Sequence, residues 1–186
     1  KNCSSRLGKI EKKENSYTKE IGVRAIINKR QAIISSTNFD KKNIDRIVDK
    51  VFEMAKVVPK NEYCGLANTY EVKKIDSSEL SKLKLLDKKN IPMKKIVEKV
   101  IELEQAALDN KKIINSEGAE ISVSKDKYIL LGSNGLSLEF EKTNNSFIVA
   151  VLAGNNESME RHYDYKSKIN FDELGNFTKI GKDVAK

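Results

Sequence analysis

The chain has 186 residues, of which 39% are hydrophobic and 33% charged, with a net charge of +8. This length allows one sizeable core or two small ones, and no apolar run approaches the roughly 18 residues that a membrane helix needs. The single histidine excludes a multi-histidine metal site, and the two distant cysteines, Cys3 and Cys64, exclude a CxxC motif and a disulfide-rich scaffold. Reduced thiols in the cytoplasm are expected.

The charge pattern predicts a solvated surface in preference to a nucleic-acid site. Nearly all the cations are lysines, and they are interleaved with acids, as in residues 9–14 (Lys-Ile-Glu-Lys-Lys-Glu). A nucleic-acid face more often concentrates arginines and aromatics on one element. We therefore expect nucleic-acid binding to be weak.

The first third of the chain predicts strands followed by a helix. Strands are expected at 6–14, at 19–27 and at 31–36, with a hairpin turn at Asn28-Lys29. Ser35-Ser36-Thr37 is expected to end the last strand and lead into a helix capped by Asp40 and ended by Pro59. The apolar stripe of that helix is Ile44, Ile47, Val48, Val51, Phe52 and Ala55.

Residues 59–92 predict a connecting segment with a short helix near Ser77-Ser78-Glu79. A second strong helix is expected from Met93 to Asn110, with Pro92 suited to its first turn. Glu104 lies at the edge of its apolar stripe and is expected at the rim, without an acid or base role.

An antiparallel meander is expected to follow. Its predicted turns are Lys125-Asp126, Asn134-Gly135, Asn144-Asn145 and Gly154-Asn155-Asn156, of which Asn-Gly is the strongest hairpin signal. The five predicted strands are 119–124, 127–133, 136–142, 146–153 and 159–166, and a helix is expected to begin near Phe177.

These elements predict an α+β fold in two linked modules, a strand-hairpin-helix unit and then a helix with a five-stranded antiparallel meander. The expected division is residues 1–58 for the first module, 59–92 for the connection and 93–186 for the second module. The chain lacks an initiator Met and stops within a helical pattern, so we expect a fragment of a longer protein.

The residue patterns predict no catalytic or metal-binding residue in this chain. His162 has no metal partner or nucleophile motif and is expected on a strand surface. Asn115-Ser116-Glu117-Gly118 lacks the spacing and the lysine of a phosphate loop, and a turn with positive φ at Gly118 is expected instead.

A polar and aromatic stripe at residues 159–166 is the candidate interaction site. In a strand, Arg161, Tyr163 and Tyr165 share one face, and residues 160, 162 and 164 share the other. Tyrosine and arginine favour interface anchors, so these three residues are a candidate interface. Cross-strand packing within one sheet remains an equal alternative.

Taken in order, several segments resemble the amino-terminal half of the TldD/PmbA family, known as modulators of DNA gyrase. The segments are Gly22-Val23-Arg24 with Ser35-Ser36-Thr37, Tyr63-Cys64-Gly65-Leu66-Ala67, Glu104-Gln105-Ala106-Ala107-Leu108, Asn115-Ser116-Glu117-Gly118, Ser133-Asn134-Gly135 and Met159-Glu160-Arg161-His162-Tyr163-Asp164-Tyr165. The last of them looks like the PmbA branch.

The resemblance implies a cytoplasmic metallopeptidase complex of two related subunits that acts in proteolysis and peptide maturation. In this family the TldD-type subunit carries zinc on a His-Glu-x-x-x-His helix, and the PmbA-type subunit lacks those ligands. The implied cofactors are therefore none in this fragment, with zinc on the partner. The implied partners are a TldD-type subunit or a second copy, and a peptide or unfolded small protein as substrate. The alternative is a non-enzymatic module that modulates DNA gyrase or binds nucleic acid.

Overall fold

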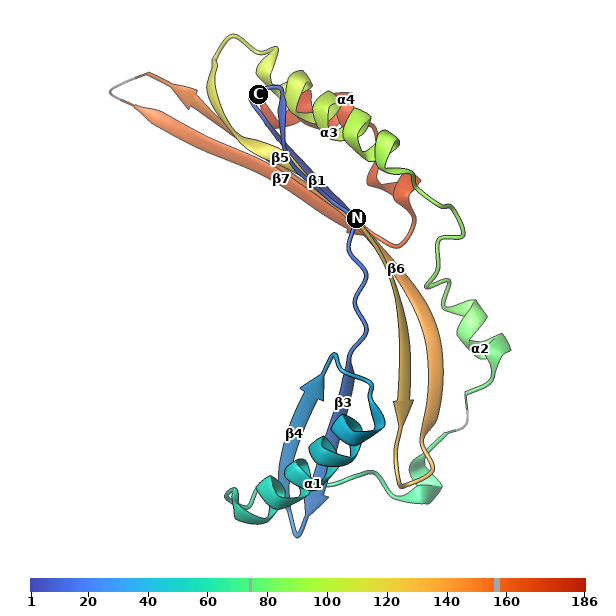
Figure 1. The fold of residues 1–186 in the computed structure, drawn as a ribbon. Helices are drawn as coiled ribbons and strands as arrows, with labels where there is room; N and C mark the ends of the chain where they lie inside the picture. The colour runs from blue at the N-terminus through green and yellow to red at the C-terminus, as the bar shows by residue number, and fades with distance from the viewer. Residues whose placement is uncertain (74, 156–157) are drawn as a thin grey trace. The chain divides into compact units, whose positions relative to one another are not determined.

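The computed structural model describes residues 1–73, 75–155 and 158–186 (Figure 1). Its elements, in chain order, are β1 (Asn2–Arg6), β2 (Lys9–Glu14), β3 (Ile21–Ile27), β4 (Arg30–Ser36), α1 (Lys41–Val57), the 3-10 helix η1 (Thr69–Glu71), α2 (Ser77–Lys82), α3 (Met93–Leu108), β5 (Ile113–Leu131), β6 (Ser137–Gly154), β7 (Met159–Lys168), the 3-10 helix η2 (Phe171–Leu174) and α4 (Phe177–Val184).

The chain folds into two compact units. Unit 1 comprises residues 1–15, 74–131 and 137–186, and unit 2 comprises residues 16–73 and 132–136. This grouping differs from the chain-order division at residues 58 and 92, because β1 pairs with β5 of the second half and β2 pairs with β1.

The sheet of unit 1 is antiparallel, in the strand order β2-β1-β5-β6-β7. The expected α+β class with a five-stranded antiparallel sheet is therefore confirmed. The strands that form this sheet differ from those of the expected meander. Two of the five, β1 and β2, come from residues 2–14, and residues 113–168 form three long strands where five short ones were expected.

The expected turns at Lys125-Asp126 and Asn144-Asn145 are wrong, because both pairs lie inside the continuous β5–β6 ladder. Asp126 faces Lys142 there, and opposite charges across a ladder are favourable. Asn145 is buried but donates its side-chain amide to the Ile169 carbonyl oxygen at 2.6 Å, which satisfies it inside a strand.

The other two expected turns have different outcomes. Asn134-Gly135 lies between β5 and β6 as predicted, and Gly135 has φ +88°. For Gly154-Asn155-Asn156, β6 ends at Gly154 and β7 begins at Met159, but Asn156 lies outside the described residues.

Helices α3 and α4 cover one face of the sheet (Figure 1). Both were expected, and α3 begins immediately after Pro92. A Cβ at Gly181 would lie 2.3 Å from the Leu103 carbonyl oxygen, so the close approach of the two helices requires glycine. The core between helices and sheet contains Cys3, Ile96, Val100, Leu103, Ile121, Phe147, Val149, Val151, Leu174 and Phe177.

Unit 2 is built on the β3–β4 hairpin and α1. The hairpin turn at Asn28-Lys29 is confirmed, and both residues have the positive φ (48° and 63°) that a type I′ turn needs. Helix α1 follows Asp40 and ends before Pro59, as predicted, although the Asp40 side chain makes no capping hydrogen bond.

The apolar stripe of α1 is only partly buried. Ile47, Val51 and Ala55 are buried, whereas Val48 and Phe52 are 44% and 49% exposed. A two-strand hairpin is too narrow to cover the whole stripe, so its edge stays accessible within this unit. Across the described residues, no helix is both long and apolar enough to cross a membrane.

Candidate interaction surface

A buried carboxylate on α3 joins two of the segments singled out in the sequence. Glu104 accepts hydrogen bonds from the backbone N–H of Leu7 (2.8 Å) and of Gly8 (3.2 Å), and from the Ser116 hydroxyl (2.6 Å). The Ser116 hydroxyl oxygen in turn accepts the N–H of Gly118 at 2.9 Å. Glu104 thus ties α3 to the β1–β2 turn and to β5.

The expectation of a rim position for Glu104 is therefore wrong, because its exposure is 0%. Periodicity places Glu104 beside an apolar stripe, but it cannot show that three donors from distant segments converge on the carboxylate. Burying a charged group requires such partners. In the sequence, segments 104–108 and 115–118 are both among the segments that carry the family resemblance. That resemblance does not show that the two segments contact each other.

The segment around Ser116 is a β-bulge. The β5–β6 register shifts between Ser116 and Gly118, and Gly118 has φ +110°. The predicted positive φ is confirmed, but it occurs inside β5 and not in a turn between helix and strand. A Cβ on Gly118 would lie 2.7 Å from the Ser5 carbonyl oxygen, so the bulge needs glycine for both conformation and space.

The bulge presents Glu117 to the candidate interface. The Arg161 Nε atom lies 2.8 and 3.0 Å from the two carboxylate oxygens of Glu117, and an Arg161 terminal nitrogen lies 2.8 Å from one of them. The hydrogen bonds from Arg161 lower the pKa of the Glu117 carboxyl, and those to Glu117 raise the pKa of the Arg161 guanidinium. The pair is exposed, so it fixes geometry more than it adds stability.

The three predicted interface residues lie together on β7. The Arg161 guanidinium is 5.1 Å from the centre of the Tyr163 ring, and the Tyr163 and Tyr165 rings are stacked with centroids 6.4 Å apart. Tyr163 is 48% exposed and Tyr165 is 67% exposed. Some packing within the sheet is therefore present, and much ring surface stays accessible.

The face of these residues is the one opposite to the helices. On β6 their cross-strand neighbours are Leu152, Ala150 and Ile148, whereas the alternate β6 residues Phe147, Val149 and Val151 enter the core beneath α3 and α4. We call Ile148, Leu152, Met159, Arg161, Tyr163 and Tyr165 the open-face patch. Its mixture of tyrosine, arginine, methionine and aliphatic side chains is typical of interface centres.

His162 lies on β7 and is exposed, as predicted. Its cross-strand neighbour is Val151, so it lies on the other face of the sheet from Arg161 and Tyr163. Across residues 1–73, 75–155 and 158–186, no three histidine, cysteine, aspartate or glutamate side chains are grouped so as to hold a metal ion.

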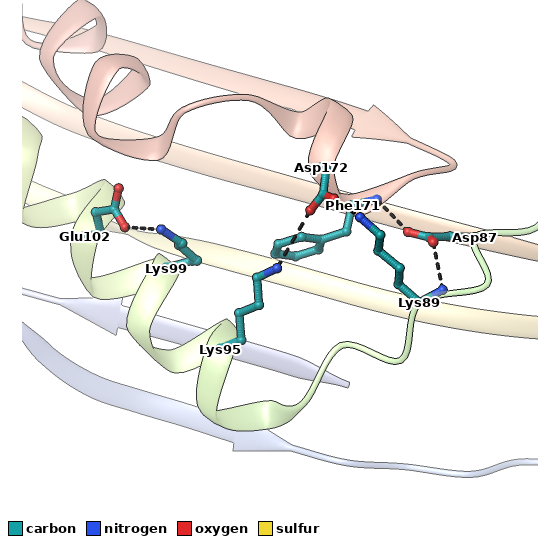
Figure 2. A network of polar contacts seen from close by, with 7 residues as sticks. All are labelled: Asp87, Lys89, Lys95, Lys99, Glu102, Phe171 and Asp172. Carbon is teal, nitrogen blue, oxygen red and sulfur yellow. Dashed lines mark hydrogen bonds and ion pairs between the residues drawn. The ribbon is translucent and has the colours of Figure 1, made fainter.

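A second polar cluster joins the segment before α3 to η2 (Figure 2). The Asp87 carboxylate accepts the backbone N–H of Lys89 and of Phe171, both at 2.9 Å. Lys89 and Lys95 both pair with Asp172, and the Lys95 ammonium lies 5.1 Å from the centre of the Phe171 ring.

The same surface continues along α3. Glu102 pairs with Lys99 at 2.6 Å and accepts the Thr178 hydroxyl at 2.7 Å. Hydrogen bonds from Lys99, and then from Thr178, lower the pKa of Glu102, and the Lys89 hydrogen bond lowers the pKa of Asp172. Their lysine partners keep these carboxylates ionised, so the cluster lacks the features of an acid–base centre. Its contacts instead connect the segment before α3, and α3 itself, to η2 and α4.

In unit 2 other segments of the ordered set also meet. Gly22 and Ser35 are direct cross-strand partners in the β3–β4 hairpin. Asn134 in the β5–β6 loop donates its side-chain amide to the Ala67 carbonyl oxygen at 3.0 Å. Several of the segments that carry the family resemblance therefore contact one another, so a structural role accounts for much of the resemblance.

Two models of one protein family match this chain. The PmbA/TldA metallopeptidase central domain matches residues 87–186, and PmbA/TldA metallopeptidase domain 1 matches residues 2–55. The Metalloprotease PmbA homolog of Haemophilus influenzae is 25% identical over 98% of the chain. The chain spans 40% of the length of that curated relative.

Solved structures share the fold. TldE from Thermococcus kodakarensis matches 99% of the chain with a TM-score of 0.74 at 16% identity, over 40% of its own chain. A candidate modulator of DNA gyrase from Bacteroides thetaiotaomicron matches 98% of the chain with a TM-score of 0.80 at 21% identity, over 42% of its own chain.

Proposed function

Because this chain belongs to the PmbA/TldD metallopeptidase family, we propose that it is the amino-terminal part of a PmbA-type subunit in a metallopeptidase complex. In this proposal the chain contributes to assembly and to enclosure of the substrate, and other parts of the complex supply the reacting groups. The complex works in proteolysis or peptide maturation in the cytoplasm, on a peptide or an unfolded small protein.

The observation that carries the proposal is the open-face patch. Its Arg161, Tyr163 and Tyr165 side chains are aligned on one face, accessible, and held in order by Glu117 and by ring stacking. Planar side chains whose geometry is already fixed lose little entropy on binding, so they favour contact with another protein surface. Within unit 1, α3 and α4 cover the other face of the sheet (Figure 1).

Zinc is the cofactor that the family resemblance implies, and the described residues do not provide a ligand set for it. The exposed His162 has no grouped acidic or thiol partners, and Cys3 is buried in the core, where burial raises the pKa of its thiol. In the proposal the metal belongs to a related TldD-type subunit.

The proposal is tested by reconstitution with the TldD-type subunit of the same organism. The full-length protein that contains this chain is mixed with that subunit, and peptide hydrolysis is measured alone and together. We expect hydrolysis only when both are present, with the zinc found by elemental analysis in the TldD-type subunit. Equal hydrolysis by that subunit alone would reject a role in the complex.

A further inference from the structure

Strand β7 is an edge strand with a long accessible side. It ends the strand order of the unit 1 sheet, and all its backbone pairing in the described residues is with β6, from Met159 to Lys168. Most of its residues are exposed. The outer side of such a strand offers N–H and C=O groups to another strand.

The charges of β7 are arranged antisymmetrically about Tyr163. Glu160 and Lys166 lie three residues before and after it, and His162 and Asp164 lie one residue before and after it. In an antiparallel pair centred on one residue, positions equally far before and after the centre face each other. We propose that β7 pairs antiparallel with β7 of a second copy of this chain, about a two-fold axis at Tyr163.

The proposed pairing is complementary at the positions of Glu160, His162, Asp164 and Lys166. Glu160 faces Lys166 of the second copy, and His162 faces Asp164 of the second copy, each twice by symmetry. On the open face, Arg161 comes beside Tyr165 of the second copy, which favours a cation–π contact. The Lys166 ammonium already donates to the Leu174 carbonyl oxygen at 3.1 Å and has further donors for a carboxylate.

Neighbouring registers are less favourable. Along β7, alternate residues point their backbone N–H and C=O groups away from β6, and these residues must pair with the equivalent residues of the second copy. The allowed registers therefore differ by one residue in the position of the two-fold axis. Centring on His162 places Glu160 against Asp164, and centring on Asp164 places that carboxylate against itself. Like charges directly opposite each other destabilise a strand pair, so Tyr163 is the favoured centre.

Strand β2, at the other edge of the sheet, provides a contrast. Its sequence is Lys-Ile-Glu-Lys-Lys-Glu, from Lys9 to Glu14. The two registers that use most of β2 place Lys9 against Lys13, or Lys12 against itself. Charged edges normally prevent pairing, and β2 fits that role, whereas the β7 pattern favours the Tyr163 register over the two registers next to it. The inference rests on the proposed assembly role and adds to it a self-association of this chain with a defined register.

Charge exchange tests the register directly. Glu160→Lys places a lysine against Lys166 of the second copy, and Lys166→Glu places two glutamates in the same position. We expect each single variant to weaken self-association of the chain at least about tenfold, because two favourable pairs become repulsive. The double variant should restore it, and a mixture of the two single variants should form heterodimers preferentially.

Sedimentation velocity over a concentration series measures these associations, with Glu11→Lys on β2 as the matched control that leaves dimerisation unchanged. A wild-type chain that stays monomeric, or a dimer insensitive to the exchange, overturns the inference. Failure of the mixed variants to associate does so too. None of these results bears on the peptide hydrolysis measured in the reconstitution experiment. The assembly role with a TldD-type subunit is therefore judged separately.

Discussion

The Arg161 Nε–H donates hydrogen bonds to both carboxylate oxygens of Glu117 across the sheet, although β6 lies between their strands. The bulge at Ser116–Gly118 makes this contact possible, because Glu117 is the extra residue of the bulge and its carboxylate contacts Arg161 on β7. The contact links the core, through Glu104 and Ser116, to the open-face patch.

We predict that the Glu117 carboxyl titrates below the usual range for glutamate and that Arg161→Ala raises its pKa. The Arg161 hydrogen bond lowers the pKa in the folded chain, so this contribution to stability is present above the unfolded pKa and is lost as pH falls through the folded pKa. Carboxyl ¹³C NMR over a pH series measures it. An unchanged pKa in the variant would show that Arg161 does not perturb the carboxyl.

Tyr163→Ala tests whether the open-face patch is an interface. If the ring contacts another subunit, association in the full-length protein should weaken by about 1–3 kcal/mol with a small change in melting temperature. If the ring mainly stabilises the sheet through Tyr165, the melting temperature should fall and association should not change. Tyr70→Ala, at a residue 84% exposed in unit 2, is the control.

The sequence predicts the parts of this fold that depend on local chemistry. The Asn28-Lys29 turn, the α1 and α3 boundaries and the positive φ of Gly118 follow from turn, cap and glycine preferences. The pairing of β1 with β5 joins residues more than a hundred positions apart, and only the folded chain specifies it. The same holds for Glu104, whose donors come from β1–β2 and β5.

Glu104→Gln should lower the free energy of unfolding by about 2–3 kcal/mol. A glutamine retains one acceptor oxygen, and its NH2 group then faces a backbone N–H or the Ser116 hydroxyl, so at least one donor to the buried side chain loses its partner. Denaturant unfolding measures the loss. Glu98→Gln, on the exposed side of the same helix, is the control and should change stability little. Equal effects of the two substitutions would contradict a special role for Glu104.

Binding to duplex DNA should be weak and without sequence preference. Lysines paired with acids, as in Lys127–Glu139 and Lys125–Glu141, leave little concentrated positive charge on those elements. The remaining affinity comes from counterion release and declines steeply with salt. A titration at about 0.15 M salt checks this. Submicromolar affinity would favour the alternative of a nucleic-acid or gyrase-directed module.

Gly118→Ala should destabilise unit 1 by at least about 2 kcal/mol and also disturb the Glu117–Arg161 contact. The φ of +110° is strained for alanine, and the added Cβ would meet the Ser5 carbonyl oxygen at 2.7 Å, so β1 and β5 must move apart. Gly8→Ala is the matched control, because Gly8 has φ +74° with its nearest side-chain atom 3.8 Å away, and it should cost only about 1 kcal/mol.

Two readouts separate strain from positioning at Gly118. Thermal unfolding reports the loss of stability, and the pKa of Glu117 reports whether Arg161 still contacts it. Because the bulge sets where Glu117 lies, we expect Gly118→Ala to raise that pKa toward the ordinary value, as removal of Arg161 does, whereas Gly8→Ala should leave it low. A destabilised Gly118→Ala variant with an unchanged Glu117 pKa would show that the bulge supports the sheet without orienting the open-face patch.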